Sequence, residues 1–341
     1  MAEEQQQQIF INLKNKSEVM PNGVVREVRT TDRFCFMLNS FAMGDVIAAA
    51  PVVKYMIDNF YTDPRSYLVV GKMAFREFFH FVPDSNFLDF DKRDNFWGIP
   101  PHYAVGALNK KVEPRLVRTT PKSMHLADYA SLIFADRLIP HEHLDYIPLD
   151  TSEVDLSKFK EINFYKSVIL VSSYRDATRS WRNESILGTA KWIKDQGLIP
   201  IFVGKTDMDQ NLSEAHKPKN SLPDDLSEFG VDLRNKTSIA ELACIFEHAL
   251  AVCGVDSGPI HLAGTTNIPI VCGYTSVSPE HRIPIRKDGN TYALTANIEC
   301  IGCESRWRSN YWNFENCYYR HANCSKLLTA DRFINVLKEI L

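Results

Sequence analysis

The sequence from Ala249 to Ala263 reads ALAVCGVDSGPIHLA and joins a strand pattern directly to a helix start. Its first five residues, Ala249 to Cys253, form an apolar run that is typical of a buried strand. Small and acidic residues follow, and Pro259 suits a first helical turn because its φ is already helical. Backbone amides at such a turn attract anions. The stretch therefore predicts a strand–helix unit whose junction either caps the helix or binds the phosphates of a nucleotide.

Strand patterns and helix patterns alternate through most of the chain, which predicts parallel sheets flanked by helices. In the first half, strands are expected at 34–38, 67–70 and 87–90, and helices at 46–57, 73–81 and 124–138. In the second half, strands are expected at 167–171, 199–203, 249–253 and 268–272, and helices at 184–196, 238–248, 259–265 and 330–340. Prolines interrupt any periodicity between 96 and 118.

The chain has 341 residues, more than a single core usually supports, and this length favours two domains. We expect an α/β fold with an N-terminal tail at 1–30, a Rossmann-like domain at 31–150 and a second one at 151–341. The second domain would include the late cysteine-containing segment and the closing helix, and the link would lie at about 139–166.

Composition indicates an ordinary soluble protein, with 45% hydrophobic and 24% charged residues and no apolar run that could form a transmembrane segment. The start lacks the pattern of a signal peptide, so we expect a cytoplasmic protein. Its net charge of −3 argues against a general nucleic-acid coat. Residues 92–122 nevertheless carry seven basic side chains against two acidic ones. This segment either faces an acidic partner or is a solvated loop.

Four of the eight cysteines cluster late, as Cys300-x2-Cys303-x13-Cys317-x6-Cys324. The first pair has the spacing of a zinc ligand pair, whereas the second pair is loosely spaced. These residues are either metal ligands or thiols, and the spacing leaves both open.

Polar residues that follow predicted strands are the candidate site residues, since ligands of doubly wound sheets bind beyond the strands' carboxyl ends. Gly44 and Asp45 place a carboxylate at a helix start, where it could act chemically or only cap the helix. Ser172, Ser173 and Arg179 combine hydroxyls with a guanidinium group, which suits a diphosphate, although an exposed loop would look the same.

Two further positions have the same ambiguity. Asp207, with Asp209 as its alternative, follows the strand end at Gly204 and could hold a ribose or lie in a simple turn. His261 lies among apolar residues, as a helix histidine with an ordinary partner would. The chain contains no Walker loop, no Gly-x-Gly-x-x-Gly fingerprint and no Gly-x-Ser-x-Gly elbow, which argues against ATPase, dehydrogenase and serine-hydrolase chemistry.

Together and in this order, the loop Gly44-Asp45-Val46, the strand end with Ser172, Ser173, Arg179 and Trp181, and the stretch Asp256–Ala263 resemble glycosyltransferase family nine, the heptosyltransferase group. The resemblance implies a GT-B architecture, in which two Rossmann-like domains face each other across a cleft. It also implies inverting, metal-independent transfer of a sugar from a nucleotide-diphosphate-sugar donor, with no cofactor. The first domain would bind the acceptor and the second the donor.

The resemblance assigns roles to individual residues. Asp45 would be the catalytic base, and the family more often has lysine where Arg179 stands. The donor-binding residues would be Ser172, Ser173, Arg179, Asp207, Thr237, Asp256, Ser257, Gly258 and His261. The acceptor-binding residues would be Gly44, Lys110, Lys111 and Arg115, and no residue would bind a metal.

The composition departs from that of bacterial family members, with 20 Phe and only 15 Gly. The basic segment at 92–122 lies in the domain that would bind the acceptor, so we expect an acidic acceptor. Two kinds fit: a saccharide of the lipopolysaccharide core, or a hydroxymethylated base in bacteriophage DNA. A nucleotide-sugar epimerase and a noncatalytic nucleotide-sugar binding protein on the same fold are the other functions considered. The sequence predicts neither the donor sugar, nor its base, nor the oligomeric state.

Overall fold

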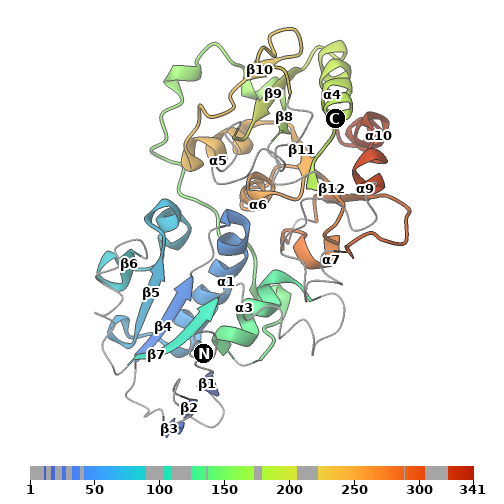
Figure 1. Cartoon of the computed structure of the whole chain (residues 1–341). Helices are drawn as coiled ribbons and strands as arrows, with labels where there is room; N and C mark the ends of the chain where they lie inside the picture. The colour runs from blue at the N-terminus through green and yellow to red at the C-terminus, as the bar shows by residue number, and fades with distance from the viewer. Residues whose placement is uncertain are drawn as a thin grey trace. The chain divides into compact units, whose positions relative to one another are not determined.

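The computed structural model describes residues 11–12, 17–19, 25–27, 33–38, 42–89, 103–108, 124–135, 137–172, 179–205, 222–287, 289–303 and 322–341. The chain forms two compact units (Figure 1). Unit 1 comprises Met1–Thr119 and Leu126–Ile147, and unit 2 comprises Thr120–His125 and Pro148–Leu341. The chain thus passes between the units three times, and the described residues Met124 and His125 belong to unit 2.

Unit 1 is built on a parallel sheet in the order β6-β5-β4-β7. Its strands are β4 (Arg33–Leu38), β5 (Tyr67–Gly71), β6 (Phe87–Asp89) and β7 (Tyr103–Leu108). Its α-helices are α1 (Met43–Phe60) and α3 (Leu126–Ala135), which pack against each other. Short 3₁₀ helices lie at η1 (Pro64–Ser66), η2 (Met73–Phe79), η3 (Asp84–Asn86) and η5 (His141–His143). Aromatic rings fill the core, as in the edge-to-face pair of Phe36 and Phe134, whose centroids are 5.4 Å apart.

Unit 2 is built on a six-stranded parallel sheet in the order β10-β9-β8-β11-β12-β13. The strands are β8 (Ser167–Val171), β9 (Ile199–Val203), β10 (Val231–Asp232), β11 (Ala251–Val255), β12 (Ile270–Tyr274) and β13 (Thr291–Thr295). The chain builds outward from β8 through β9 to β10, then returns to the other side of β8 with β11. This is the strand order of a Rossmann fold, and its topological switch point lies between β8 and β11.

Helices connect the strands of unit 2. They are η6 (Ser157–Phe159), η7 (Phe164–Lys166), α4 (Asn183–Asp195), α5 (Ile239–His248), α6 (Gly258–Ala263), α7 (Pro279–Arg282), α9 (Asn323–Lys326) and α10 (Ala330–Ile340). The last helix, α10, packs on α4, and the Phe333 ring stacks on Trp181 with centroids 4.0 Å apart. Trp181 is 2% exposed, so this aromatic residue of the family-like motif belongs to the core.

Most predicted elements are present, and two expectations need correction. The second-half strands predicted at 249–253 and 268–272 begin two residues later, at Ala251 and Ile270. The interval 96–118, where prolines interrupted the pattern, contains β7. Within the predicted tail at 1–30, the strands β1 (Ile11–Asn12), β2 (Ser17–Val19) and β3 (Val25–Glu27) pair antiparallel.

None of the helices in the part of the chain that the structure describes is long and apolar enough to cross a bilayer.

Candidate functional site

The carboxyl end of the unit 2 sheet brings together residues from two neighbouring strands. Ser172 comes directly after β8 and Asp256 directly after β11, and these strands pair in parallel. The two residues therefore lie on either side of the topological switch point, the place where doubly wound sheets bind ligands.

A buried cluster of charged and polar side chains surrounds Asp256. Arg179 donates through Nη2 to the Asp256 carboxylate Oδ2, and the same nitrogen lies 3.4 Å from the Asp256 carbonyl oxygen. His261 donates through Nε2 to Asp256 Oδ1 at 3.2 Å. The exposed fractions of the Arg179, Asp256 and His261 side chains are 8%, 5% and 2%. This cluster joins residues that are 77 positions apart in the sequence.

The cluster keeps Asp256 ionised. Burial by itself raises the pKa of the Asp256 carboxyl, but the Arg179 charge, the His261 hydrogen bond and the Arg282 charge outweigh burial. The result is a pKa well below the usual range of an aspartate. Asp256 therefore holds Arg179 and His261 in place at the strand end, with its negative charge already compensated.

The turn after Asp256 offers an unpaired buried hydroxyl. Ser257 is the N-cap of α6, yet its side chain makes no capping bond, and its buried Oγ has no hydrogen-bond partner among the described residues. Pro259 has no N–H, and the amides of Ile260 and His261 donate to the Ser257 carbonyl. Ser257 Oγ and the amides of Ser257 and Gly258 are thus the groups that this turn could offer to a ligand. Buried hydroxyls are normally hydrogen-bonded, and an oxygen atom of a ligand could be the hydrogen-bond partner of Ser257 Oγ.

The other residues of unit 2 that were predicted to bind the sugar donor lie outside the Asp256 cluster or outside the described residues. Ser172 Oγ donates to the Val203 carbonyl at 3.0 Å, which ties the ends of β8 and β9 together. Thr237 is half-buried in the loop between β10 and α5. Ser173 and Asp207 lie outside the described residues.

Asp45 and Gly44 belong to unit 1, in the first turn of α1. Asp45 is 6% exposed, and its amide donates to the carbonyl of Ala42, the N-cap residue, at 3.1 Å. A carboxylate in a first turn also interacts favourably with the helix dipole, so this position suits both a stabilising and a chemical role. The predicted acceptor residues Lys110, Lys111 and Arg115 lie outside the described residues.

Sequence reasoning missed Arg282, whose charge acts on Asp256 from α7. Its neighbour His281 donates through Nδ1 to the Met124 carbonyl, and His125 Nε2 donates to the Ile283 carbonyl at 2.7 Å. The available signal was position, because α7 follows the carboxyl end of β12 just as α6 follows that of β11.

Residues 121–310, more than half of the chain, match the family described as glycosyltransferase family 9 (heptosyltransferase). The chain belongs to this family. The match includes the whole Asp256 cluster and Arg282, so the resemblance inferred from the motifs is confirmed.

One curated relative of this family 9 chain is lipooligosaccharide heptosyltransferase 2 of Haemophilus influenzae, which is 34% identical over 107 residues. That alignment covers 31% of this chain and 30% of the relative.

Solved structures show the GT-B fold expected for family 9. The iron-containing dodecameric glycosyltransferase TibC from enterotoxigenic E. coli is 15% identical and has a TM-score of 0.66, with 93% of this chain and 78% of that one covered. A family 9 glycosyltransferase of Veillonella parvula is 13% identical with a TM-score of 0.57, covering 92% of this chain and 98% of that one. The E. coli ADP-heptose lipopolysaccharide heptosyltransferase II is 12% identical with a TM-score of 0.56, over 78% of this chain and 92% of its own.

Proposed function

We propose that this family 9 member is an inverting glycosyltransferase that moves a heptose, or a closely similar sugar, from a nucleotide-diphosphate donor to a hydroxyl of a saccharide. The observation that carries the proposal is the buried Arg179–Asp256–His261 cluster beside the unpaired Ser257 hydroxyl, at the switch point of the unit 2 sheet. The curated relative is a lipooligosaccharide heptosyltransferase, and TibC has been solved with ADP-D-β-D-heptose. These names support heptose as the sugar and ADP as the carrier.

In this proposal, residues 151–341 bind the donor. Departure of the nucleotide leaves negative charge on the diphosphate, and fixed donors that are already oriented stabilise such charge most effectively. Arg179 supplies a guanidinium group that Asp256 holds in place, and Ser257 supplies a hydroxyl that lacks a partner in the part of the chain that the structure describes. Transfer is then independent of a catalytic metal ion, and we expect full turnover in the presence of excess chelator.

Residues 31–150 bind the acceptor, and Asp45 is the general base. Its carboxylate takes the proton of an acceptor hydroxyl while that oxygen attacks the anomeric carbon from the face opposite the diphosphate. The bond from the anomeric carbon to the diphosphate oxygen breaks as the new glycosidic bond forms, so the configuration inverts. The nucleotide diphosphate leaves with the electron pair, and the proton stays on Asp45 until solvent removes it.

A saccharide is the preferred acceptor because the relatives named for an acceptor act on lipooligosaccharide or lipopolysaccharide. Hydroxymethylated DNA is the competing acceptor, and no relative named above is described as acting on DNA. The salt dependence of acceptor binding distinguishes the two acceptors, since binding to duplex DNA through phosphates weakens steeply as ionic strength rises.

TibC is described as iron-containing, which raises the question of iron in this chain. Cys303 donates its amide to the Cys300 carbonyl at 3.1 Å, and Gly302 between them has a φ of +70°, as in a tight turn. However, the sulfur atoms of Cys300, Cys303 and Cys324 do not all lie within 4.8 Å of one another, and Cys317 lies outside the described residues. No step of the proposed reaction uses an iron ion.

The test is mass spectrometry of the products formed from a panel of nucleotide sugars with either lipopolysaccharide core or hydroxymethylated DNA. We expect a mass increase of one heptose on the saccharide with ADP-heptose. Sugar added only to DNA would overturn the proposed acceptor. Conversion of the donor sugar without any acceptor would indicate an epimerase, and donor binding without any product would indicate a noncatalytic binding protein.

A further inference from the structure

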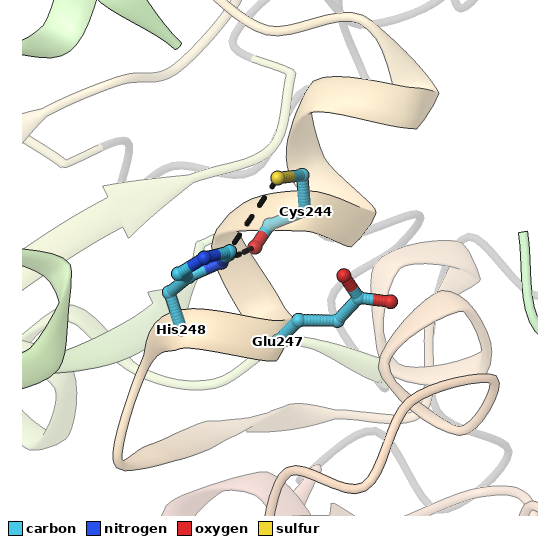
Figure 2. A group of neighbouring side chains, drawn as sticks. All are labelled: Cys244, Glu247 and His248. Atoms are coloured by element: carbon cyan, nitrogen blue, oxygen red, sulfur yellow. Dashed lines mark hydrogen bonds between the residues drawn. The ribbon is translucent and has the colours of Figure 1, made fainter. Parts of the chain in front are cut away.

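The last turn of α5 carries a group of side chains that the proposed reaction does not use. Cys244, Glu247 and His248 are three and four residues apart and therefore share one face of the helix (Figure 2). One ligand atom of each lies within 4.8 Å of the other two. Within the described ranges of the chain, no other group of three or more histidine, cysteine or acidic side chains meets this criterion.

This group lies at the opposite end of the sheet from the Asp256 cluster. His248 ends α5, and β11 begins three residues later at Ala251, whereas Asp256 follows the other end of β11. A five-residue strand spans roughly 16 Å at 3.3 Å per residue. The group is therefore separate from the candidate donor site.

The spacing of the two strongest ligands fits a tetrahedral ion. Cys244 Sγ lies 3.9 Å from His248 Nδ1. Zinc–sulfur and zinc–nitrogen bonds of about 2.3 and 2.05 Å at a tetrahedral angle place sulfur and nitrogen about 3.6 Å apart. A small shift of either side chain closes this difference.

Neighbouring groups hold the ligands in place. Before an ion binds, His248 Nδ1 donates to the Cys244 carbonyl at 2.7 Å, which keeps the imidazole ring beside the thiol, and the bond to the ion replaces this hydrogen bond. Thr151 donates through Oγ1 to Glu247 Oε2 at 2.6 Å and leaves the other carboxylate oxygen for an ion. The Tyr165 ring packs edge-on against the His248 ring, with centroids 5.2 Å apart. The carboxyl end of a helix also favours a cation because of its dipole.

We propose that Cys244, Glu247 and His248 bind one divalent cation of the Zn²⁺ type, with water as the fourth ligand. A thiolate, an imidazole and a carboxylate together select Zn²⁺ or Co²⁺ over Mg²⁺ and Ca²⁺, which prefer oxygen ligands alone. On binding, the Cys244 thiol releases one proton to solvent. The His248 proton moves from Nδ1 to Nε2 through solvent exchange, and the hydrogen bond from Nδ1 to the Cys244 carbonyl breaks. The ring then turns so that the Nδ1 lone pair faces the ion and not that carbonyl.

The test is a titration of the full-length, chelator-stripped protein with Co²⁺, whose bond to thiolate absorbs in the near ultraviolet. We expect the wild type to bind one equivalent more than Cys244→Ser and His248→Gln. Cys303→Ser is the matched cysteine control and keeps that equivalent. Zn²⁺ displaces the Co²⁺, whereas Mg²⁺ does not.

Thr151→Val tests the site without removing a ligand. It deletes the hydroxyl that orients Glu247 and should weaken Co²⁺ binding by roughly 10- to 100-fold. If Cys244→Ser fails to fold, Thr151→Val and Glu247→Gln test whether the ion binds at this group. Equal stoichiometry and affinity in all these variants would overturn the proposal, as would loss of the equivalent in Cys303→Ser instead.

Discussion

At the scale of single residues, Arg179 is paired with a carboxylate although its proposed ligand is a phosphate. The guanidinium group has several N–H donors, and Nη2 is the one that contacts Asp256. Pairing with Asp256 restricts the Arg179 side chain to one position before the donor binds. Less conformational entropy is therefore lost on binding.

Arg179→Ala should weaken donor binding, because it removes the fixed charge at the diphosphate, and should also destabilise the protein. Removing one partner of a buried ion pair typically costs about 3 kcal/mol or more, since the remaining charge stays buried. The double variant Arg179→Ala/Asp256→Ala should regain part of the stability but none of the donor affinity. Calorimetric titration with the donor and denaturant unfolding separate the two effects, and an unchanged donor affinity in Arg179→Ala would contradict the phosphate role.

The depressed pKa of Asp256 predicts a pH dependence of stability. The carboxyl is more acidic in the folded chain than in the unfolded chain, where its pKa is about 3.9. Its contribution is therefore complete above the unfolded pKa and is lost as the pH falls through the folded pKa. The free energy of unfolding of the wild type should exceed that of Asp256→Asn most at neutral pH, and the difference should shrink below about pH 4. A difference that does not depend on pH would argue against an ionised Asp256.

Asp45→Asn keeps the shape of the side chain and removes its basicity. We expect kcat to fall by about 10² to 10⁴, the usual contribution of general base catalysis. Donor affinity should change little, because the base acts on the acceptor. Single-turnover assays and donor titration check this, and unaltered turnover would remove Asp45 from the mechanism.

At the scale of elements, apolar runs predicted the buried strands well, and the displaced starts have local causes. The predicted strand at 249 starts late because the Ala249 amide still closes the last turn of α5, by donating to the Ile245 carbonyl. The same strand continues through Gly254, a residue that strand propensity disfavours. An added Cβ at Gly254 would meet Val171 at 2.9 Å, so packing selects the glycine there.

The site was predictable as a set of strand ends but not as a set of contacts. Position after a strand pointed to Ser172 and Asp256, whereas the pairing of Asp256 with Arg179 depends on tertiary structure. Arg282 had no motif of its own and was missed for that reason. The Cys244 group escaped notice because its three residues are spread over one helical turn without a familiar spacing.

The start of α5 offers a test at this scale. Ser238 accepts from the Glu241 amide at 3.1 Å, and Glu241 Oε2 accepts from the Ser238 amide at 2.7 Å, forming a capping box. Ser238→Ala should lower the free energy of unfolding by about 1 kcal/mol, and Ser238→Asp, which keeps a capping oxygen, by less. Denaturant unfolding of both variants measures the difference. Equal losses would show that the side-chain cap contributes little.

At the scale of the whole molecule, the chain is interleaved between its units. Residues 120–125 belong to unit 2 although unit 1 supplies the sequence on both sides of them. His125 and the Met124 carbonyl make the hydrogen bonds that attach this excursion to Ile283 and His281.

His125→Ala should weaken this attachment by about 1 to 3 kcal/mol, the cost of leaving a partly buried carbonyl without its donor. We expect the midpoint of thermal unfolding to fall, because unit 2 loses a hydrogen bond between two of its own segments. His125→Gln, which retains an N–H donor, should resemble the wild type. Calorimetric scans of the three proteins make the comparison, and identical scans would show that this bond contributes little to stability.

The same excursion has a consequence for how the protein is made. His125 leaves the ribosome 158 residues before Ile283, its hydrogen-bond partner. At roughly 5 to 20 residues per second, the segment waits about 8 to 30 s for the residues that hold it. Unit 1 is fully synthesised by residue 147, so it can fold during that interval with the excursion undocked. The attachment of His125 to the rest of unit 2 is then a late event in synthesis, and it depends on the last third of the chain.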